Sequence, residues 1–304
     1  MTTRPTVSVI MATTVVCIWA ASFIFIKLAL LQIPPMTLAF VRFAVATPLL
    51  IAITSPARAS REMMIDALTK DFWTFAFLGL IGVTLLYVFQ FYSLKLISAT
   101  AGSVVINLHA VFAMLLSAAF LKEQLTLRKI GGVLVAFSGV TVMSMESATN
   151  TLNSIQPVGV LLMVAAALCW ASYSVFGKRA LQRYSNQVAT SCVFLLGTLF
   201  LVPFAIGEGR LNTLLESSWL TWISVLFLAI PCSVVAYVLW NHMIAVTDVT
   251  KVLVSLYFIP IPTAILSYVF LGETITYPLV IGAILVLAGV YLTQSSSIRR
   301  KGSG

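Results

Sequence analysis

Long apolar runs follow one another along almost the whole chain, each closed by a short polar segment. A helix that crosses a bilayer needs about 20 consecutive, mostly apolar residues. The pattern therefore predicts ten membrane-spanning helices, at residues 7–31, 36–54, 72–94, 98–120, 128–146, 157–180, 187–206, 218–241, 249–271 and 277–295. Segment 60–71 mixes Met63, Met64 and Leu68 with charges, which predicts a short amphipathic helix on the membrane surface. The expected fold class is an all-α polytopic membrane protein.

One stretch of the sequence occurs twice. Residues 120–143 and 270–293 share seven identical positions, which are Phe120/Phe270, Leu121/Leu271, Glu123/Glu273, Thr126/Thr276, Gly132/Gly282, Gly139/Gly289 and Val140/Val290. Upstream, Trp19 and Lys27 match Trp170 and Lys178 at an offset of 151. We expect a first five-helix repeat at 1–146, a connecting loop at 147–156 and a second five-helix repeat at 157–297. A basic tail at 298–304 would follow, its final Gly-Ser-Gly a flexible cloning remnant.

The odd number of spans in each repeat has a topological consequence. With five spans per repeat, the second copy enters the membrane upside down relative to the first. In transporters built from such inverted repeats, the substrate site lies near the bilayer midplane between the halves, and rocking gives alternating access. The glycines spaced by seven in spans five and ten are expected to let these spans pack closely as a scaffold.

Composition excludes a soluble domain. Hydrophobic residues make up 60% of the chain and charged residues 9%, and the mean hydropathy is +1.05. No core of this size could hide so much apolar surface from water. The four cysteines, all within apolar runs, are interpreted as buried packing thiols, with no metal-ligand spacing. The first apolar run is longer than a signal-peptide core, so no cleavable signal is expected.

The net charge of +9 is distributed asymmetrically. If the N-terminus is cytoplasmic, fourteen basic residues fall on the inner side and three, Lys27, Lys95 and Arg210, on the outer side. This agrees with the positive-inside rule and predicts that both termini are cytoplasmic. The basic residues lie in short loops, so they are assigned to membrane orientation and not to nucleic-acid binding.

Three motifs together resemble a known family. They are the Trp-containing first helix from Trp19 to Lys27, the pair Arg42-Phe43, and the hairpin FLxExxT followed by Gly-spaced apolar residues, which occurs at 120–126 and 270–276. The chain resembles EamA-type members of the drug/metabolite transporter superfamily over nearly its whole length, and by overall likeness it is similar to YddG-type exporters of aromatic amino acids. One departure is that Cys192 and Val193 stand where the second repeat would carry a counterpart of Arg42.

Candidate substrate-binding residues are aromatic and polar side chains at helical spacing on the spans expected to line the interface. They are Trp19, Phe23, Arg42, Tyr87, Phe91, Ser103, Asn107, Trp170, Tyr173, Ser174, Tyr237, Trp240 and Tyr257. Such a lining suits a flat, amphipathic solute whose ring stacks on aromatic side chains. The alternative for each aromatic is a place in a membrane-interface belt or in helix packing.

Charged and titratable groups inside the spans are few. Arg42 is a candidate partner for a substrate carboxylate, or else it bonds backbone carbonyls or snorkels outward. His109 is a candidate proton relay, with a core histidine as the favoured alternative. Lys27 and Lys178 are expected to snorkel. Glu123 and Glu273 are interpreted as loop and helix-start residues.

Two further features bear on mechanism. No Asp or Glu lies in the core of a predicted span, which disfavours a proton-coupled antiporter of cationic drugs and favours a facilitator. Pro260 and Pro262 interrupt span nine, whereas span four has Ala110 and Phe112 there, so the sequence suggests unequal inner and outer gates or a tolerated kink.

The sequence therefore predicts a multi-pass transporter of the bacterial inner membrane that exports small amphipathic metabolites, foremost amino acids including aromatic ones. Alternatives are export of nucleosides or of small drugs by proton antiport, and, more remotely, a membrane scaffold or an intramembrane enzyme. With two histidines, His109 and His242, and no carboxylate in the core of a span, enzymatic activity is not expected. No cofactor, metal or nucleic acid is expected; the partners are a small-molecule substrate and the lipid bilayer. Both halves occur in one chain, so a monomer is expected.

Overall fold

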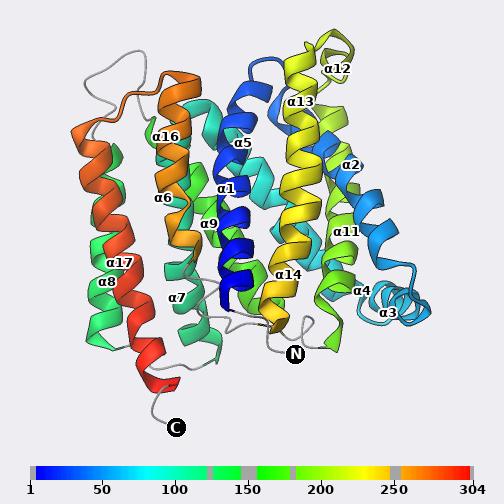
Figure 1. Cartoon of the computed structure of the whole chain (residues 1–304), viewed down its shortest axis with the longest axis horizontal. Coiled ribbons are helices and arrows are strands. Elements are labelled where there is room, and N and C mark those ends of the chain that lie inside the picture. Colours follow the sequence, from blue (N-terminus) through cyan, green and yellow to red (C-terminus); the bar gives the residue numbers. More distant parts are fainter. Residues whose placement is uncertain (1–4, 122–125, 145–155, 179–182, 247–254, 302–304) are drawn as a thin grey trace.

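Backbone amides inside a bilayer must satisfy their hydrogen bonds within the chain, and helices do so segment by segment. The computed structural model describes residues 5–121, 126–144, 156–178, 183–246 and 255–301, and every regular element within these ranges is helical (Figure 1). The first half contains α1 (Pro5–Ala29), α2 (Pro35–Thr54), α3 (Arg58–Thr69), α4 (Phe72–Gly79), η1 (Leu80–Leu85), α5 (Leu86–Leu96), α6 (Ala99–Val105), η2 (Ile106–Leu108), α7 (His109–Leu121) and α8 (Leu127–Ser144). The second half contains α9 (Pro157–Phe176), α11 (Asn186–Gly207), α12 (Thr213–Glu216), α13 (Trp219–Phe227), η4 (Leu228–Val235), α14 (Ala236–Val246), η5 (Leu256–Phe258), α16 (Pro260–Leu271) and α17 (Tyr277–Lys301).

Eight helical stretches in the described part are long and apolar enough to cross a membrane. They are Val9–Ala29, Pro35–Thr54, Phe72–Leu96, Ala99–Phe120, Leu127–Ser144, Pro157–Phe176, Asn186–Gly207 and Trp219–Met243. Two shorter apolar stretches, Leu256–Leu271 and Tyr277–Thr293, coincide with the predicted ninth and tenth spans. The chain is thus a multi-pass membrane protein, and the count of ten spans stays a prediction.

The two ends of the bundle carry different elements. The start of α1, the end of α17 and the surface helix α3 lie at one end, and α12 lies at the other (Figure 1). We name these the inner and the outer end, following the predicted orientation, which remains a prediction. Residues 147–155 of the connecting loop, Glu123 and the Gly-Ser-Gly tail lie outside the described residues.

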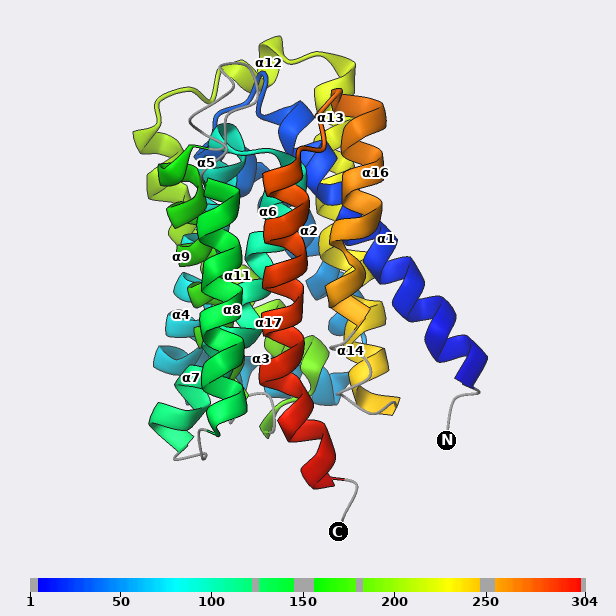
Figure 2. The ribbon, with the colours of Figure 1, turned by 90° about the vertical axis from the view of Figure 1, so that its left-hand side faces the viewer.

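Matching positions of the two halves meet in space. The hydroxyls of Thr47 on α2 and Thr198 on α11, which are 151 residues apart, lie 2.9 Å from each other. At the edge of the bundle α8 packs along α17 (Figure 2). A Cβ added at Gly132 would lie 2.8 Å from the carbonyl oxygen of Gly289, and one added at Gly139 would lie 2.6 Å from that of Gly282. The predicted close packing of these two spans is confirmed.

The third and fourth spans are distorted at matching places in both halves. A π-helical turn, η1 or η4, interrupts the third span of each half, and a 3₁₀ turn, η2 or η5, interrupts the fourth. In the second half Pro231 lies inside η4 and Pro260 begins α16. The interruption of span nine that Pro260 and Pro262 suggest is therefore present, and span four is interrupted too, although η2 forms without a proline.

Side-chain chemistry accounts for η2. The Asn107 side-chain amide donates to the carbonyl of Ser103 at 2.8 Å, and Nδ1 of His109 lies 3.0 Å from the carbonyl of Ile106. Both side chains therefore compete with backbone amides for helix carbonyls. The prolines of the second half and these polar side chains of the first half thus produce the same interruption of the fourth span.

Helix α3 forms where the sequence predicts an amphipathic segment. Met64 and Ala67 are buried on one face, which packs against α4 and α11. The exposed face carries the ion pairs Arg58–Glu62 and Lys70–Asp66, each 2.9 Å long. This division into an apolar and a charged face suits a helix that lies along a membrane surface.

The four cysteines are free thiols. Cys192 and Cys232 are buried and Cys169 is half-buried, but Cys17 is exposed. The expectation that all four are buried is wrong for Cys17. Val15 and Val16, directly before it, are buried, so Cys17 lies on the outward face of α1.

Candidate functional site

Four aromatic side chains form a closed ring where the two halves meet. Ring centroids lie 4.7 Å apart for Phe43 and Tyr87, 5.0 Å for Phe43 and Phe194, and 5.0 Å for Phe194 and Tyr237, all edge-to-face. The hydroxyls of Tyr87 and Tyr237 close the ring at 3.4 Å. Tyr87 and Tyr237 are 150 residues apart and Phe43 and Phe194 are 151 apart, so the ring is built from equivalent positions of the repeats.

Arg42 lies against this ring and breaks its symmetry. The side chain is only 3% exposed, and its Cζ lies 4.6 Å from the Tyr87 ring centroid and 5.3 Å from that of Phe43. Its Nε donates to Oγ of Ser233 at 2.9 Å, and Ser233 donates to the carbonyl of Leu228 at 2.9 Å. Arg42 thus neither snorkels nor relies on backbone carbonyls.

No carboxylate among the described residues forms an ion pair with Arg42. Cation–π contacts and one hydroxyl compensate its charge only partly, since burying a charge away from water is costly. A guanidinium presents a fork of donors that matches a carboxylate. The matching place of the second half is held by Cys192 and Val193, so the site has a single cation.

Trp19 joins the ring from α1. Its indole Nε1 donates to the backbone carbonyl of Cys232 at 3.2 Å, a carbonyl that belongs to the π-helical turn η4. Its ring centroid lies 5.8 Å from that of Tyr237 and 5.3 Å from that of Trp240. Trp19, Tyr237 and Trp240, all predicted site residues, therefore lie together, and Tyr237 connects them to the aromatic ring.

The counterpart of Trp19 has a different environment. The ring of Trp170 stacks on His109, with centroids 4.2 Å apart and planes 14° apart. Tyr173 packs over η1, because a Cβ added at Gly82 would lie 2.5 Å from its ring. Ser174 is exposed and donates to the carbonyl of Trp170 at 2.9 Å. The structure does not bring Trp170 or Ser174 to Arg42.

His109 is buried and held on both sides. One face stacks on Trp170, and Nδ1 lies within hydrogen-bond distance of the Ile106 carbonyl. A carbonyl only accepts, so Nδ1 carries a proton in this contact. This geometry is that of a core histidine, the alternative that the sequence favours over a proton relay.

The remaining predicted residues divide into two groups. Phe91 extends the ring, with its centroid 5.8 Å from that of Tyr87, and Tyr257 is half-buried in η5. Phe23 is buried in the core. The polar groups of Ser103 and Asn107 bond within their own helix, where Ser103 donates to the carbonyl of Thr100 at 2.7 Å and Asn107 to that of Ser103.

Two carboxylates at the outer end hold the starts of helices that lie far away in the sequence. Glu208, just after α11, accepts hydrogen bonds from the backbone amide of Thr37 at 2.8 Å and from its hydroxyl at 2.9 Å. Glu273, just after α16, accepts one from the amide of Ala99 at 2.8 Å. Lys27, expected to snorkel, instead lies 3.7 Å from the carboxylate of Glu273.

Sequence reasoning did not select Phe43, Phe194 or Ser233 as site residues. The two phenylalanines carry a usable signal, because they match at an offset of 151 in the same way as Trp19 and Trp170. Ser233 carries none, since Val83 stands 150 residues before it. Its contact with Arg42 follows only from the packing of η4 against α2.

A bundle of membrane-spanning helices, built from two halves whose equivalent residues meet around a buried arginine, is the architecture of a small-molecule transporter. The chain belongs to the EamA-like transporter family, which matches residues 6–145 and again residues 157–295. Both the predicted superfamily and the duplication are confirmed, and the family is one of transporters.

Curated relatives cover nearly the whole chain. A transporter of Archaeoglobus fulgidus is 38% identical over 278 residues, covering 91% of this chain and 94% of its own. A Salmonella typhimurium protein named "Probable amino-acid metabolite efflux pump" is 28% identical over 291 residues, 93% of each chain. A Streptantibioticus cattleyicolor protein named "Probable terminal-alkyne amino-acid exporter" is 25% identical over 283 residues, 93% of this chain and 92% of its own. A solved crystal structure with 20% identity has the same fold, with a TM-score of 0.61 over 99% of this chain and 100% of its own.

Proposed function

We propose that this protein exports small amphipathic metabolites, foremost amino acids including aromatic ones, across the inner membrane of a bacterium. The observation that carries the proposal is the buried Arg42 beside the aromatic ring of Phe43, Tyr87, Phe194 and Tyr237. The printed names of two relatives, which refer to amino-acid efflux or export, support the same substrate class.

The chemistry of the site suits an α-amino acid with an aromatic side chain. The carboxylate pairs with the guanidinium of Arg42, whose Nε is already held by Ser233. The substrate ring packs against Trp19 and the tyrosines, which offer apolar faces with polar edges. Only one half of the protein provides a cation, so the substrate binds in one orientation, with its carboxylate toward α2.

Transport proceeds by alternating access between the two halves. Ten spans in two inverted repeats, with both termini in the cytoplasm, place the aromatic ring near the bilayer midplane, where the sites of such transporters lie. No carboxylate is present in the core of a predicted span to carry a proton, so the protein works as a facilitator that moves its substrate down a gradient. Each chain contains both repeats and functions as a monomer.

The experiment is uptake of radiolabelled tryptophan, phenylalanine and leucine into proteoliposomes that contain the purified protein. We expect saturable uptake that does not depend on a pH gradient, that is lost in Trp19→Ala and that is kept in the matched control Trp73→Ala, because Trp73 is 83% exposed. Absence of amino-acid uptake by protein that elutes as a single folded species would overturn the substrate class. Uptake driven by a pH gradient would overturn the facilitator mechanism.

A further inference from the structure

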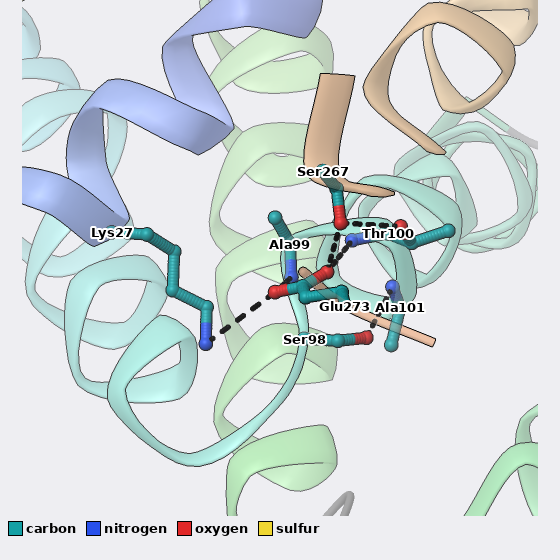
Figure 3. Close-up of polar contacts among 7 residues, drawn as sticks. All are labelled: Lys27, Ser98, Ala99, Thr100, Ala101, Ser267 and Glu273. Carbon is teal, nitrogen blue, oxygen red and sulfur yellow. Dashed lines mark hydrogen bonds and ion pairs between the residues drawn. The ribbon is translucent and has the colours of Figure 1, made fainter. Parts of the chain in front are cut away.

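A buried carboxylate ties the two halves together at the outer end of the bundle. Glu273 lies in the loop after α16 and is 8% exposed. Its Oε1 accepts a hydrogen bond from the amide of Ala99 at 2.8 Å, and its Oε2 accepts one from the amide of Thr100 at 3.4 Å (Figure 3). The hydroxyl of Ser267 on α16 also donates to Oε2.

Two more contacts complete this cluster. Nζ of Lys27, near the end of α1, lies 3.7 Å from Oε1 of Glu273, and the hydroxyl of Thr100 donates to that of Ser267 at 3.2 Å (Figure 3). Glu273 and Ser267 come from the second half, whereas Lys27, Ala99 and Thr100 come from the first. Separation of α16 from α1 and α6 would break all of these contacts at once.

The start of α6 is capped from both halves of the protein. The residue that precedes this helix, Ser98, already accepts a hydrogen bond from the amide of Ala101 at 3.1 Å. Glu273 adds acceptors from more than 170 residues away in the sequence. Its carboxylate therefore caps a helix of the first half from a loop of the second and so joins the two halves.

Helices of both halves meet around this cluster. Helix α1 packs against α5 and α6 of its own half and against α16 of the other. Helix α16 also packs against α6. The Glu273 cluster thus lies at the outer end, where α16 of the second half contacts α1 and α6 of the first.

We propose that Glu273 is a latch that holds the outer end of the transport path closed. The groups that bind its carboxylate are Lys27, Ser267 and the amides of Ala99 and Thr100. The proposal rests on the alternating-access part of the proposed function and is independent of the substrate. A carboxylate that loses these donors must find water instead, since an unpaired buried charge is costly. Opening the outer end therefore requires that Glu273 become hydrated, and substrate leaves when water reaches this cluster.

The test measures the distance across the latch without substrate. Spin labels are attached to Leu31→Cys and Ile275→Cys, which are 80% and 51% exposed, in a cysteine-free variant of the full chain in nanodiscs. Double electron–electron resonance of the parent should give one short distance. Glu273→Ala should add a second, longer population. Glu273→Gln, which keeps an acceptor oxygen but loses the charge, and Lys27→Met should each add a smaller one.

Two controls separate opening of the gate from general loosening. Glu62→Ala removes a carboxylate from an exposed ion pair on α3 and should leave the distance unchanged. A second label pair, Ile65→Cys with Leu127→Cys, lies on exposed positions of the first half and should keep its distance in Glu273→Ala. The latch is overturned if Glu273→Ala leaves the Leu31–Ile275 distances unchanged, or if both label pairs shift together. A longer Leu31–Ile275 population in protein that does not transport amino acids would support the latch and contradict only the substrate class.

Discussion

The contact between α8 and α17 gives a sharp test, because two adjacent glycines of α8 meet different surroundings. A Cβ at Gly132 would lie 2.8 Å from the Gly289 carbonyl oxygen and 3.0 Å from Cβ of Leu292, so a helix backbone would have to move. A Cβ at Gly131 would meet nothing within 4 Å. Overpacking of this kind costs about 1–3 kcal/mol. Replacing an unconstrained helix glycine with alanine instead gains roughly 0.5–1 kcal/mol.

Gly132→Ala should therefore lower the thermal unfolding midpoint by roughly 2–8 °C, whereas Gly131→Ala should leave it unchanged or raise it. The assay is tryptophan fluorescence of the purified protein during heating in one detergent, with both variants measured beside the parent. The same substitution at neighbouring positions of one helix removes differences in expression or detergent binding as an explanation. A midpoint for Gly132→Ala at or above that of Gly131→Ala would refute the close α8–α17 contact.

Three further predictions concern residues outside the central site or at its margin. Burial and the hydrogen bond that its hydroxyl donates to Asp71 at 2.5 Å raise the pKa of Tyr184 to about 12. The stability that this group contributes is therefore present below pH 10 and is lost as the pH rises toward 12. Tyr184→Phe should reduce this loss of stability in unfolding midpoints measured over a series of pH values. His109→Gln should lower the unfolding midpoint, because it removes the ring that stacks on Trp170. Amino-acid uptake should continue and should still not depend on a pH gradient; loss of uptake would instead indicate a proton relay. Glu208→Ala should destabilise the protein by about 1–2 kcal/mol in denaturant titrations through the lost cap of α2, and no change would show that water replaces the carboxylate.

Much of the architecture could be predicted because hydropathy reports bilayer crossing directly. The second span, predicted at 36–54, is observed as Pro35–Thr54, and the surface helix predicted at 60–71 is observed as Arg58–Thr69. The glycines of spans five and ten also revealed their partner, since equivalent small residues at a spacing of seven mark a close contact.

The site could be predicted only in part, because helical spacing shows which residues share a face and not which helix covers that face. Trp19, Arg42 and Tyr237 do lie together, but Trp170 instead stacks on His109. The hydroxyls and amides of Ser103 and Asn107 look available on a helical projection, yet they bond carbonyls of their own helix. Ser233, which contacts Arg42, lies inside the π-helical turn η4, and no sequence pattern reports that turn.

The central claim is that Arg42 binds the carboxylate of the substrate. The most direct measurement compares the uptake efficiency of tryptophan with that of tryptophanamide, in which the carboxylate is neutralised, for the parent and for Arg42→Ala, with the exposed Arg58→Ala as control. A hydrogen bond to a charged group contributes about 1.5–3 kcal/mol, so the parent should prefer tryptophan by roughly 10- to 150-fold. Arg42→Ala should lose most of this preference and Arg58→Ala none. An Arg42→Ala protein that transports tryptophan and keeps the full preference would contradict the account.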